Sequence, residues 1–202
     1  MANSSDDPDS QDHLERLLQQ RARIKKGAVQ KPTRFGDFLD MDHPTPAIVF
    51  CEDTEQLEDI QTELDDRNLR YGVYISDREA EQGAAFHKFE TGAIDYLLAI
   101  RCLDEGVDVP DCSTAVLISS STNERQYIQR RGRVLRTSAG KEQAAIYDML
   151  AFPGVQAAAG EDAAMTLIKQ ELDRAKLLMK AAMNREASER QLAEELDSYD
   201  KD

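Results

Sequence analysis

The chain has 202 residues, of which 41% are hydrophobic and 32% charged, which is enough apolar sequence for one folded domain with an extension and excludes wholesale disorder. The three cysteines show no CxxC spacing, which argues against a zinc site or a disulfide framework. No apolar run approaches the roughly 20 residues that span a bilayer, and the acidic N-terminus is not a secretory signal. We therefore expect a soluble, cytoplasmic protein without a membrane partner.

The formal net charge is −14, from 25 basic and 39 acidic residues. Such an acidic surplus suits a protein that stays hydrated in concentrated salt, so we expect a halophilic source. Two stretches nevertheless hold six cations each and no acid, which predicts contact with a polyanion, with a solvated helix face as the alternative for each. They are residues 125–141, with Arg125, Arg130, Arg131, Arg133, Arg136 and Lys141, and residues 21–34, with Arg21, Arg23, Lys25, Lys26, Lys31 and Arg34.

In chain order, the sequence predicts a disordered acidic tail over residues 1–11, and a connector helix with a linker over residues 12–45. The helix opens at a capping box, Asp12 to Glu15, and three prolines (Pro32, Pro44 and Pro46) then break the chain. Short apolar strands and amphipathic helices alternate after that, which favours a parallel sheet buried on both faces. The expected fold is an α/β three-layer domain over residues 46–153, with strands at 47–51, 71–75, 96–100, 114–118 and 144–147, and helices at 54–67, 78–89 and from 123.

A C-terminal helical extension with an acidic tail is expected over residues 154–202. One long helix should run from beyond Gly160 to about Leu196. Apolar residues recur along it at spacings of three and four, and this stripe stops after Ala182, where Glu186 and Glu189 follow. We therefore expect the helix to pack on its own domain rather than in a coiled coil.

The ligands of an open α/β sheet gather at the carboxyl ends of its strands. The expected strand 96–100 is followed by a loop that combines three carboxylates with Gly106 and Pro110. The glycine would let backbone approach a ligand closely, and a fixed carboxylate such as Asp108 can accept hydrogen bonds from ribose hydroxyls. The alternative is a tight connection with solvated acids.

The pair Asp104-Glu105 superficially resembles a Mg²⁺-binding Walker B element. That element requires a phosphate-binding loop, and the sequence contains no Gly-x-x-x-x-Gly-Lys-Ser/Thr. We therefore predict no metal site, and no binding of a nucleoside triphosphate by this chain alone.

A second unusual strand end is followed by the arginine-rich segment 125–136. Arg133 and Arg136 lie three residues apart and so project to one side of a helix or tight turn. Their permanently charged, planar guanidinium groups match phosphoryl oxygens, and Gly132 would end or kink the helix before them. An arginine beside a transferring phosphoryl group stabilises transition-state charge. The alternative is an exposed basic helix.

At these residues the sequence resembles the C-terminal RecA-like domain of superfamily 2 helicases and translocases of the DEAD/DEAH type. Strand 47–51 with the following Glu52-Asp53 is similar to motif IV, and residues 98–110 are similar to motif V. Residues 129–136 are similar to motif VI in the form found in DNA repair and restriction helicases. The resemblance covers about residues 46–152, and the helix before it resembles the connector between two motor lobes.

The resemblance implies that ATP is bound by the other lobe and that arginine fingers from this lobe act on it. Nucleic-acid phosphates would be held by the loops of motifs IV and V, but Ile100 stands where many relatives have a phosphate-binding threonine, and Arg101 can take that contact instead. The implied catalytic residues are Arg133, Arg136 and Gln129; the implied nucleotide-binding residues are Gly106, Asp108, Arg133 and Arg136; and the implied nucleic-acid-binding residues are Arg101, Arg130 and Arg131.

The implied function is that of the second motor lobe of an ATP-dependent DNA helicase or translocase, with RNA left open as a substrate. ATP with Mg²⁺ would be held mainly by a first lobe, in cis or in trans, and the chain would be inactive alone. The alternative is a stand-alone nucleic-acid- or protein-binding module without ATPase activity. An unrelated α/β enzyme is disfavoured, because His13, His43 and His87 show no ligand spacing and neither a Gly-rich first turn nor a nucleophile elbow is present.

Overall fold

The computed structural model describes residues 30–75, 79–100, 112–118, 143–152, 161–180 and 182–199. The chain divides into two compact units, residues 1–149 and residues 150–202, and each is described by itself. None of the helices in these ranges is long and apolar enough to cross a membrane.

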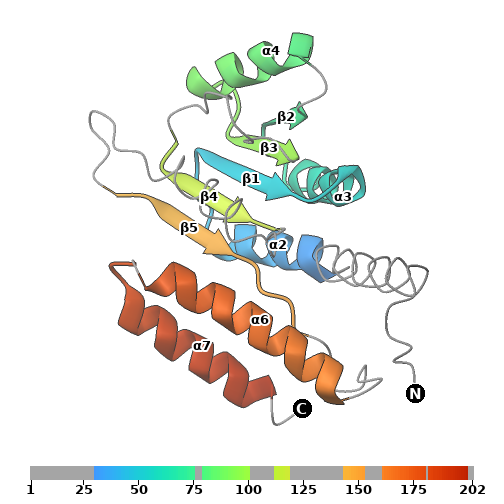
Figure 1. The fold of residues 1–202 in the computed structure, drawn as a ribbon. Coiled ribbons are helices and arrows are strands. Elements are labelled where there is room, and N and C mark those ends of the chain that lie inside the picture. The colour runs from blue at the N-terminus through green and yellow to red at the C-terminus, as the bar shows by residue number, and fades with distance from the viewer. Residues whose placement is uncertain are drawn as a thin grey trace, which may run out of the picture. The chain divides into compact units, whose positions relative to one another are not determined.

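The first unit contains a five-stranded parallel sheet with the strand order β2-β3-β1-β4-β5 (Figure 1). The three central strands are buried at every position, as a parallel sheet covered on both faces requires. The predicted parallel sheet is therefore confirmed. Its strands are β1 (Ala47–Cys51), β2 (Tyr71–Ile75), β3 (Tyr96–Ile100), β4 (Thr114–Leu117) and β5 (Ala145–Asp148).

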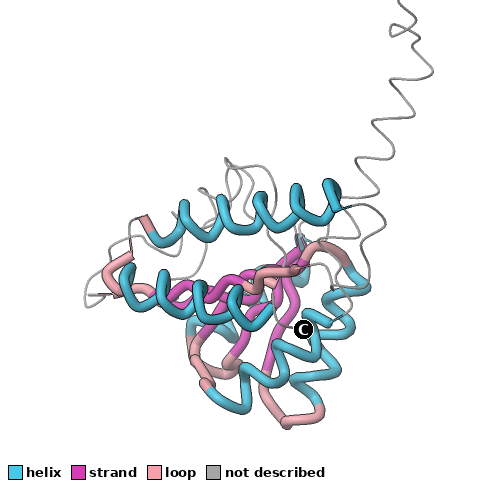
Figure 2. Tube along the Cα trace, turned by 90° about the horizontal axis from the view of Figure 1, so that it is seen from below, coloured by secondary structure: helices cyan, strands magenta, loops and turns pink. Residues whose placement is uncertain are grey.

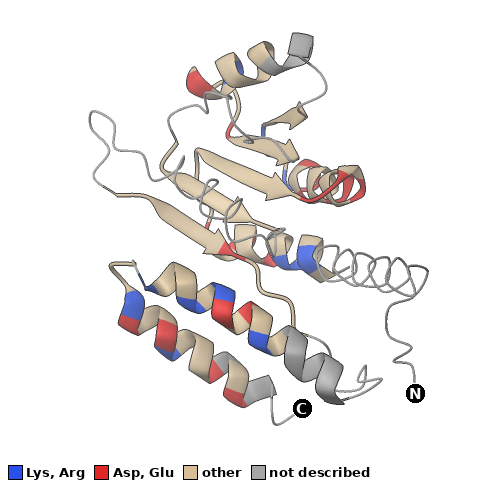
Figure 3. Cartoon of the chain, in the orientation of Figure 1, with Lys and Arg blue, Asp and Glu red and all other residues tan. Residues whose placement is uncertain are grey.

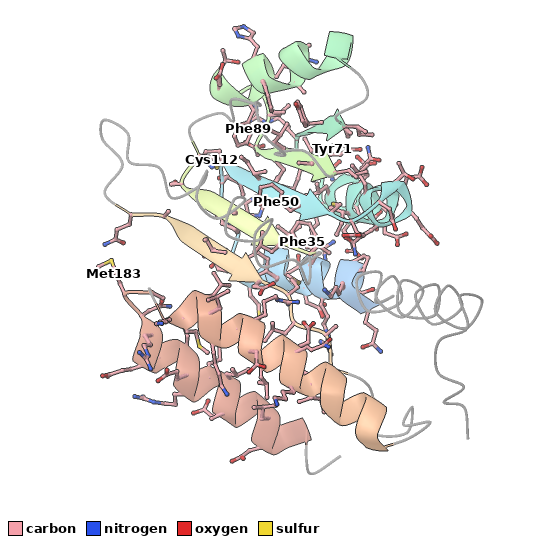
Figure 4. All side chains as sticks on the ribbon, viewed as in Figure 1. Phe35, Phe50, Tyr71, Phe89, Cys112 and Met183 are labelled. Carbon is pink, nitrogen blue, oxygen red and sulfur yellow. The ribbon has the colours of Figure 1, made fainter. Side chains whose placement is uncertain are left out.

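Two helices, α2 (Gln30–Met41) and α3 (Thr54–Asp65), cover one face of this sheet (Figure 2). Phe35 and Leu39 of α2 and Ile60 of α3 are buried in one apolar cluster with Val49 and Leu98 of the sheet. Figure 4 labels Phe35 at this junction between helix and sheet. The helix over residues 30–41 therefore contributes side chains to the core of the first unit.

A third helix, α4 (Glu79–Glu90), packs against β2 and β3 from the other face. The packing is close, because a Cβ atom at Gly72 of β2 would lie 3.6 Å from the Cβ atom of Ala85 in α4, and 2.6 Å from Cδ1 of Ile94, which follows this helix. The rings of Tyr74 and Phe86 stack with centroids 4.4 Å apart and planes 9° from parallel. Helix, sheet and helix thus form the three expected layers.

Pro32 does not break the chain, contrary to the prediction. It is the third residue of α2 and is buried. Proline fixes φ near the helical value, so a helix that does not need the missing N–H group can include it. Pro44 and Pro46 do follow the end of α2 and precede β1, as expected.

In residues 161–180 and 182–199 the structure describes two helices of the second unit, where one was predicted. They are α6 (Glu161–Met179) and α7 (Arg185–Tyr199), which contact each other. The prediction of one helix to about Leu196 is wrong because the chain turns after Met179, where Ala182 N–H donates to the carbonyl of Met179, and a new helix begins at Asn184, whose carbonyl accepts from Ser188 N–H. Asparagine is a preferred residue before a first helical turn, and Asn184 is the signal in the sequence that the prediction missed.

Candidate functional site

The carboxyl ends of four strands meet at one edge of the sheet. In the register, Cys51 of β1 pairs with Ile100 of β3, and Ile100 also pairs with Ile75 of β2. On the other side of β1, Phe50 pairs with Leu117 of β4. Neighbouring parallel strands lie about 4.8 Å apart, so the segments that leave β3 and β4 begin roughly 10 Å from each other.

The predicted site residues all lie outside the described residues. Arg101 is joined directly to Ile100, and Gly106 and Asp108 follow in the same stretch, residues 101–111. The arginine-rich segment belongs to residues 119–142, which join β4 to β5. The structure therefore positions the strand ends from which these segments leave, and the roles of their side chains stay predictions; the residues concerned are Gln129, Arg130, Arg131, Arg133 and Arg136.

The acids after β1 have a local structural role. Asp53 is the N-cap of α3, with an extended backbone (φ −147°, ψ −179°), and its Oδ1 accepts from the N–H of Gln56 at 3.0 Å. The Oε1 atom of Gln56 accepts in return from the N–H of Glu52 at 3.0 Å. This reciprocal cap satisfies backbone donors that a helix start leaves free, which fixes the turn between β1 and α3.

Ile100 lies in the core rather than in a phosphate site. Its side chain is 5% exposed and belongs to the apolar cluster under α2 and α3. The sequence departs from the family pattern here, and burial explains why an apolar residue suits the position. A contact to phosphate at this strand end would have to come from another residue.

The second stretch predicted to contact a polyanion is residues 21–34. For Lys31, one of its six cations, this prediction is wrong. This residue is only 5% exposed, and its Nζ atom donates to the carbonyl oxygen of Ile118 at 2.7 Å. A buried ammonium group bonded to backbone is not available to a polyanion. Arg34 is exposed and pairs with Asp37 at 3.2 Å, and the other four cations of the stretch lie outside the described residues.

Charge is distributed unevenly over the described helices. Figure 3 marks acidic residues in red on the ribbon of α3, and the sequence of this helix contains five acids and no basic residue. A polyanion would be repelled from this surface. A nucleic acid is therefore not expected to lie along α3.

The described carboxylates do not form a metal site. No group of three His, Cys, Asp or Glu side chains within the described ranges has an arrangement that could hold a metal ion. At the carboxyl edge, Asp53 is engaged with the first turn of α3.

A model of the family described as helicase conserved C-terminal domain matches residues 30–138, which is more than half of the chain. The chain belongs to this family. The match begins at α2, in agreement with the contribution of α2 to the core. Membership confirms the predicted resemblance to the C-terminal lobe of superfamily 2 helicases.

Curated relatives and solved structures agree with this assignment. The chain is 33% identical over 132 residues to a putative DNA 3'-5' helicase Rad25 of Halobacterium salinarum, which covers 65% of this chain and 21% of that protein. It is 34% identical over 89 residues to the DNA 3'-5' translocase XPB2 of Sulfurisphaera tokodaii, which covers 44% and 19%. A DEAD box protein from the hyperthermophile Methanococcus jannaschii matches with a TM-score of 0.56 at 20% identity, over 77% of this chain and 38% of that one.

The chain thus spans about a fifth of the length of these two curated relatives. The structural likeness confirms the predicted RecA-like fold. The family match covers both α2 and the arginine-rich segment.

Two features of the described structure were missed at the sequence level. One is the contact from Lys31 to Ile118, which joins positions 87 residues apart. The other is the ion pair of Arg67 with Asp40 and Glu63, which fastens α2 to α3. The contact from Lys31 to Ile118 and the pair of Arg67 with Asp40 depend on how helices pack, so no local pattern signals them. Glu63 and Arg67 do stand four residues apart, which is the spacing of a helical ion pair.

Proposed function

We propose that this chain is the second motor lobe of an ATP-dependent superfamily 2 DNA helicase or translocase, with a role in DNA repair. It supplies arginine fingers and nucleic-acid contacts to ATP that a first lobe holds, in cis or in trans. Family membership supports this proposal, as do two relatives whose names describe a DNA 3'-5' helicase and a DNA 3'-5' translocase.

The strand register at the carboxyl edge is the observation that carries the proposal. β3 and β4 flank β1, and their last residues lie level with Cys51 and Phe50. The segment with Gly106 and Asp108 leaves from β3, and the arginine-rich segment leaves the same edge from β4. β3 and β4 are both neighbours of β1, so both predicted nucleotide-facing segments begin at the same carboxyl edge of the sheet. Open α/β sheets bind their ligands at this edge.

The chemistry assigned to this lobe is electrostatic. Arg133 and Arg136 stabilise the charge that develops on the transferring phosphoryl group, and Gln129 lies beside it. Gly106 and Asp108 contact the nucleotide sugar. Arg101 with Arg130 and Arg131 holds nucleic-acid phosphates.

Mg²⁺ belongs with ATP on the first lobe. The described carboxylates do not fit it, since they form no cluster and Asp53 is engaged in a helix cap. No step on this lobe is therefore assigned to the metal ion. The cleft between the lobes must close for turnover, and so we expect the chain alone to be inactive.

The test is ATPase activity with and without duplex DNA in concentrated potassium chloride, for the chain alone and mixed with a separately expressed first lobe. Activity only in the mixture supports the proposal. Arg133→Ala should then lower kcat by about 10³-fold or more, as for arginine fingers in general. The matched control is Arg185→Ala, which removes an exposed arginine of α7 paired with Glu189 and should leave kcat unchanged.

Other outcomes overturn parts of the proposal. Unchanged turnover of Arg133→Ala would remove the arginine-finger assignment. DNA binding without ATPase in any mixture would favour the stand-alone binding module. Turnover by the chain alone would contradict the assignment of ATP binding to a first lobe.

A further inference from the structure

Lys31 is a charged residue buried on the core-facing side of α2, which it shares with Phe35 and Leu39. The neighbouring residues Gln30 and Arg34 are exposed, whereas Lys31 is 5% exposed. Burying an ammonium group is costly unless it is bonded, so its hydrogen bond must offset the loss of hydration. The bond of 2.7 Å from Nζ to the carbonyl oxygen of Ile118 supplies a charge-assisted partner.

Ile118 is the last described residue before the arginine-rich segment. It follows β4 directly, its side chain is fully buried, and its N–H group donates to the carbonyl of Phe50 at 3.1 Å. Both polar groups of its backbone are therefore held, the N–H by β1 and the carbonyl by Lys31 of α2. Ser119, the next residue, begins the stretch that carries Gln129, Arg133 and Arg136.

The helix that carries Lys31 is itself fixed to the sheet. Phe35 and Leu39 are buried in the core, and at the other end of α2 the carboxylate of Asp40 accepts two hydrogen bonds from Arg67. Because α2 is held along its length, Lys31 cannot follow a shift of Ile118. The ammonium group of Lys31 thus restricts the position of the Ile118 carbonyl, at which the chain leaves β4.

We propose that Lys31 is a positioning residue, which holds the Ile118 carbonyl and so sets where the arginine-rich segment leaves the sheet. The inference rests on the proposed function for its catalytic consequence, and on the described contacts alone for the positioning itself. An arginine finger acts only when it is placed accurately against the phosphoryl group, and small displacements are costly. Lys31 therefore acts on turnover without touching nucleotide or nucleic acid.

The positioning is tested on the chain alone by amide hydrogen exchange. The reporter is the Ile118 N–H group, which donates to the carbonyl of Phe50 at 3.1 Å and is protected only while Ile118 is held in place. Lys31→Met, which keeps the unbranched apolar stem and removes the donor, should speed its exchange about tenfold, the equivalent of one lost hydrogen bond. Arg70→Met removes a cation that pairs with Asp95 before β3, at the opposite edge of the sheet, and should leave this exchange unchanged.

Equal exchange of the Ile118 N–H group in the native chain and in Lys31→Met would overturn the positioning role. If Lys31→Met does not fold, Lys31→Gln is measured in its place; its shorter side chain also cannot reach the carbonyl, so the same acceleration is expected. These measurements need no ATPase activity. They therefore test the positioning role of Lys31 even if the proposed function is wrong.

The catalytic consequence is tested in the mixture with a first lobe. Lys31→Met should lower kcat about ten- to a hundredfold, while the KM for ATP stays within about twofold because no nucleotide contact is lost. Thermal melting must show that the variant is folded at the assay temperature. An unchanged kcat would overturn the link to turnover, whereas a native mixture without ATPase would overturn the proposed function itself.

Discussion

Arg67 and Asp40 join the chain after α3 to α2 through two parallel hydrogen bonds, from Nε to Oδ1 and from Nη2 to Oδ2, each at 2.8 Å. The same guanidinium donates from Nη1 to Oε2 of Glu63 at 2.7 Å. The hydrogen bond from Arg67 holds the pKa of Asp40 below its ordinary value. One arginine thus connects two helices on the same face of the sheet.

This pair predicts an acid-dependent loss of stability. Because the folded-state pKa of Asp40 is lowered from 3.8, its contribution is fully present above that value and is lost as the pH falls through the lower folded pKa. Asp40→Asn should therefore be less stable than the native chain at neutral pH, with a difference that shrinks below about pH 4. Urea unfolding of both proteins between neutral pH and about pH 3 measures this.

The control for Asp40 is Asp37→Asn on the same helix, which removes a pair with Arg34 whose two side chains are both more than half exposed. It should change the unfolding free energy little, as is usual for exposed pairs. If the difference in unfolding free energy between Asp40→Asn and the native chain stayed constant down to about pH 3, the role of this carboxylate would be contradicted. Concentrated salt should also reduce that difference, since the pair is partly exposed.

Substitution by alanine should stabilise the chain at one helical glycine and much less at another. Gly83→Ala in α4 should stabilise the chain by about 0.5–1 kcal/mol, because alanine has the higher helix propensity and a Cβ there meets no atom within 4 Å. A Cβ at Gly36 of α2 would overlap Oε2 of Glu63 and lie 2.9 Å from Nη2 of Arg67. Gly36→Ala should therefore lose most of this gain, because Glu63 has to leave Arg67.

A double-mutant cycle separates the two effects at Gly36. In a Glu63→Ala background the obstructing carboxylate is gone, so Gly36→Ala should regain most of the helix-propensity gain. Chemical denaturation of the four proteins gives the coupling free energy. Additive changes would show that Glu63 does not restrict this position.

The sheet could be predicted from the sequence because its strands carry their own signal. Residues 47–51 and 96–100 are continuous apolar runs bounded by polar segments, and such runs are typical of strands buried on both faces. Contacts that depend on packing carry no such signal. Lys31 stands in a stretch rich in cations, and only the position of Ile118 shows that its ammonium group turns inward.

The break after Met179 was missed for a different reason. Residues 180–184 contain neither glycine nor proline, so the usual signs of a turn are absent, and only Asn184 marks the new helix. For the site, the motifs identify candidates such as Arg133 from residue type and spacing. The sheet register then supplies what spacing cannot, namely that the strands before both motifs end beside β1.

A buried ion pair in the second unit should be far more sensitive to mutation than an exposed one. Glu171 is fully buried, and its Oε2 atom accepts from Arg174 Nη2 at 2.8 Å and from the N–H of Ala151 at 3.3 Å. Arg174→Met leaves the carboxylate without its cation and should cost about 3 kcal/mol or more. Arg185→Met breaks the exposed pair with Glu189 and should cost less than about 1 kcal/mol.

The losses of unfolding free energy in both variants are measured by chemical denaturation of the chain, with a spectroscopic probe in α6 or α7 that reports on the second unit. Similar losses for the two variants would show that burial of Glu171 does not decide the strength of its pair. Glu171→Leu, which removes the charge and keeps the volume, should cost less than Arg174→Met, because the buried carboxylate is then removed rather than deprived of its cation.

The hydroxyl of Tyr96 should reduce stability rather than add to it. The residue is fully buried, and its hydroxyl oxygen has no hydrogen-bond partner among the described residues. An unpartnered buried polar group costs about 1–3 kcal/mol, so Tyr96→Phe should raise the unfolding free energy by about 1 kcal/mol at neutral pH. Tyr147→Phe is the matched control and should lower it, because the Tyr147 hydroxyl donates to Oδ2 of Asp42 at 2.8 Å.

Alkaline pH gives a second readout of the same residue. Burial raises the pKa of Tyr96 from 10.0 to about 12, and the charges of Asp95 and Asp42 add to the effect. Above pH 10 the unfolded chain loses this proton while the folded chain keeps it, so the contribution of Tyr96 to stability falls as the pH rises from about 10 to about 12. Tyr96→Phe should flatten the fall in unfolding free energy over this range, and an identical slope in both proteins would show that the phenol ionises equally in the folded and unfolded chain.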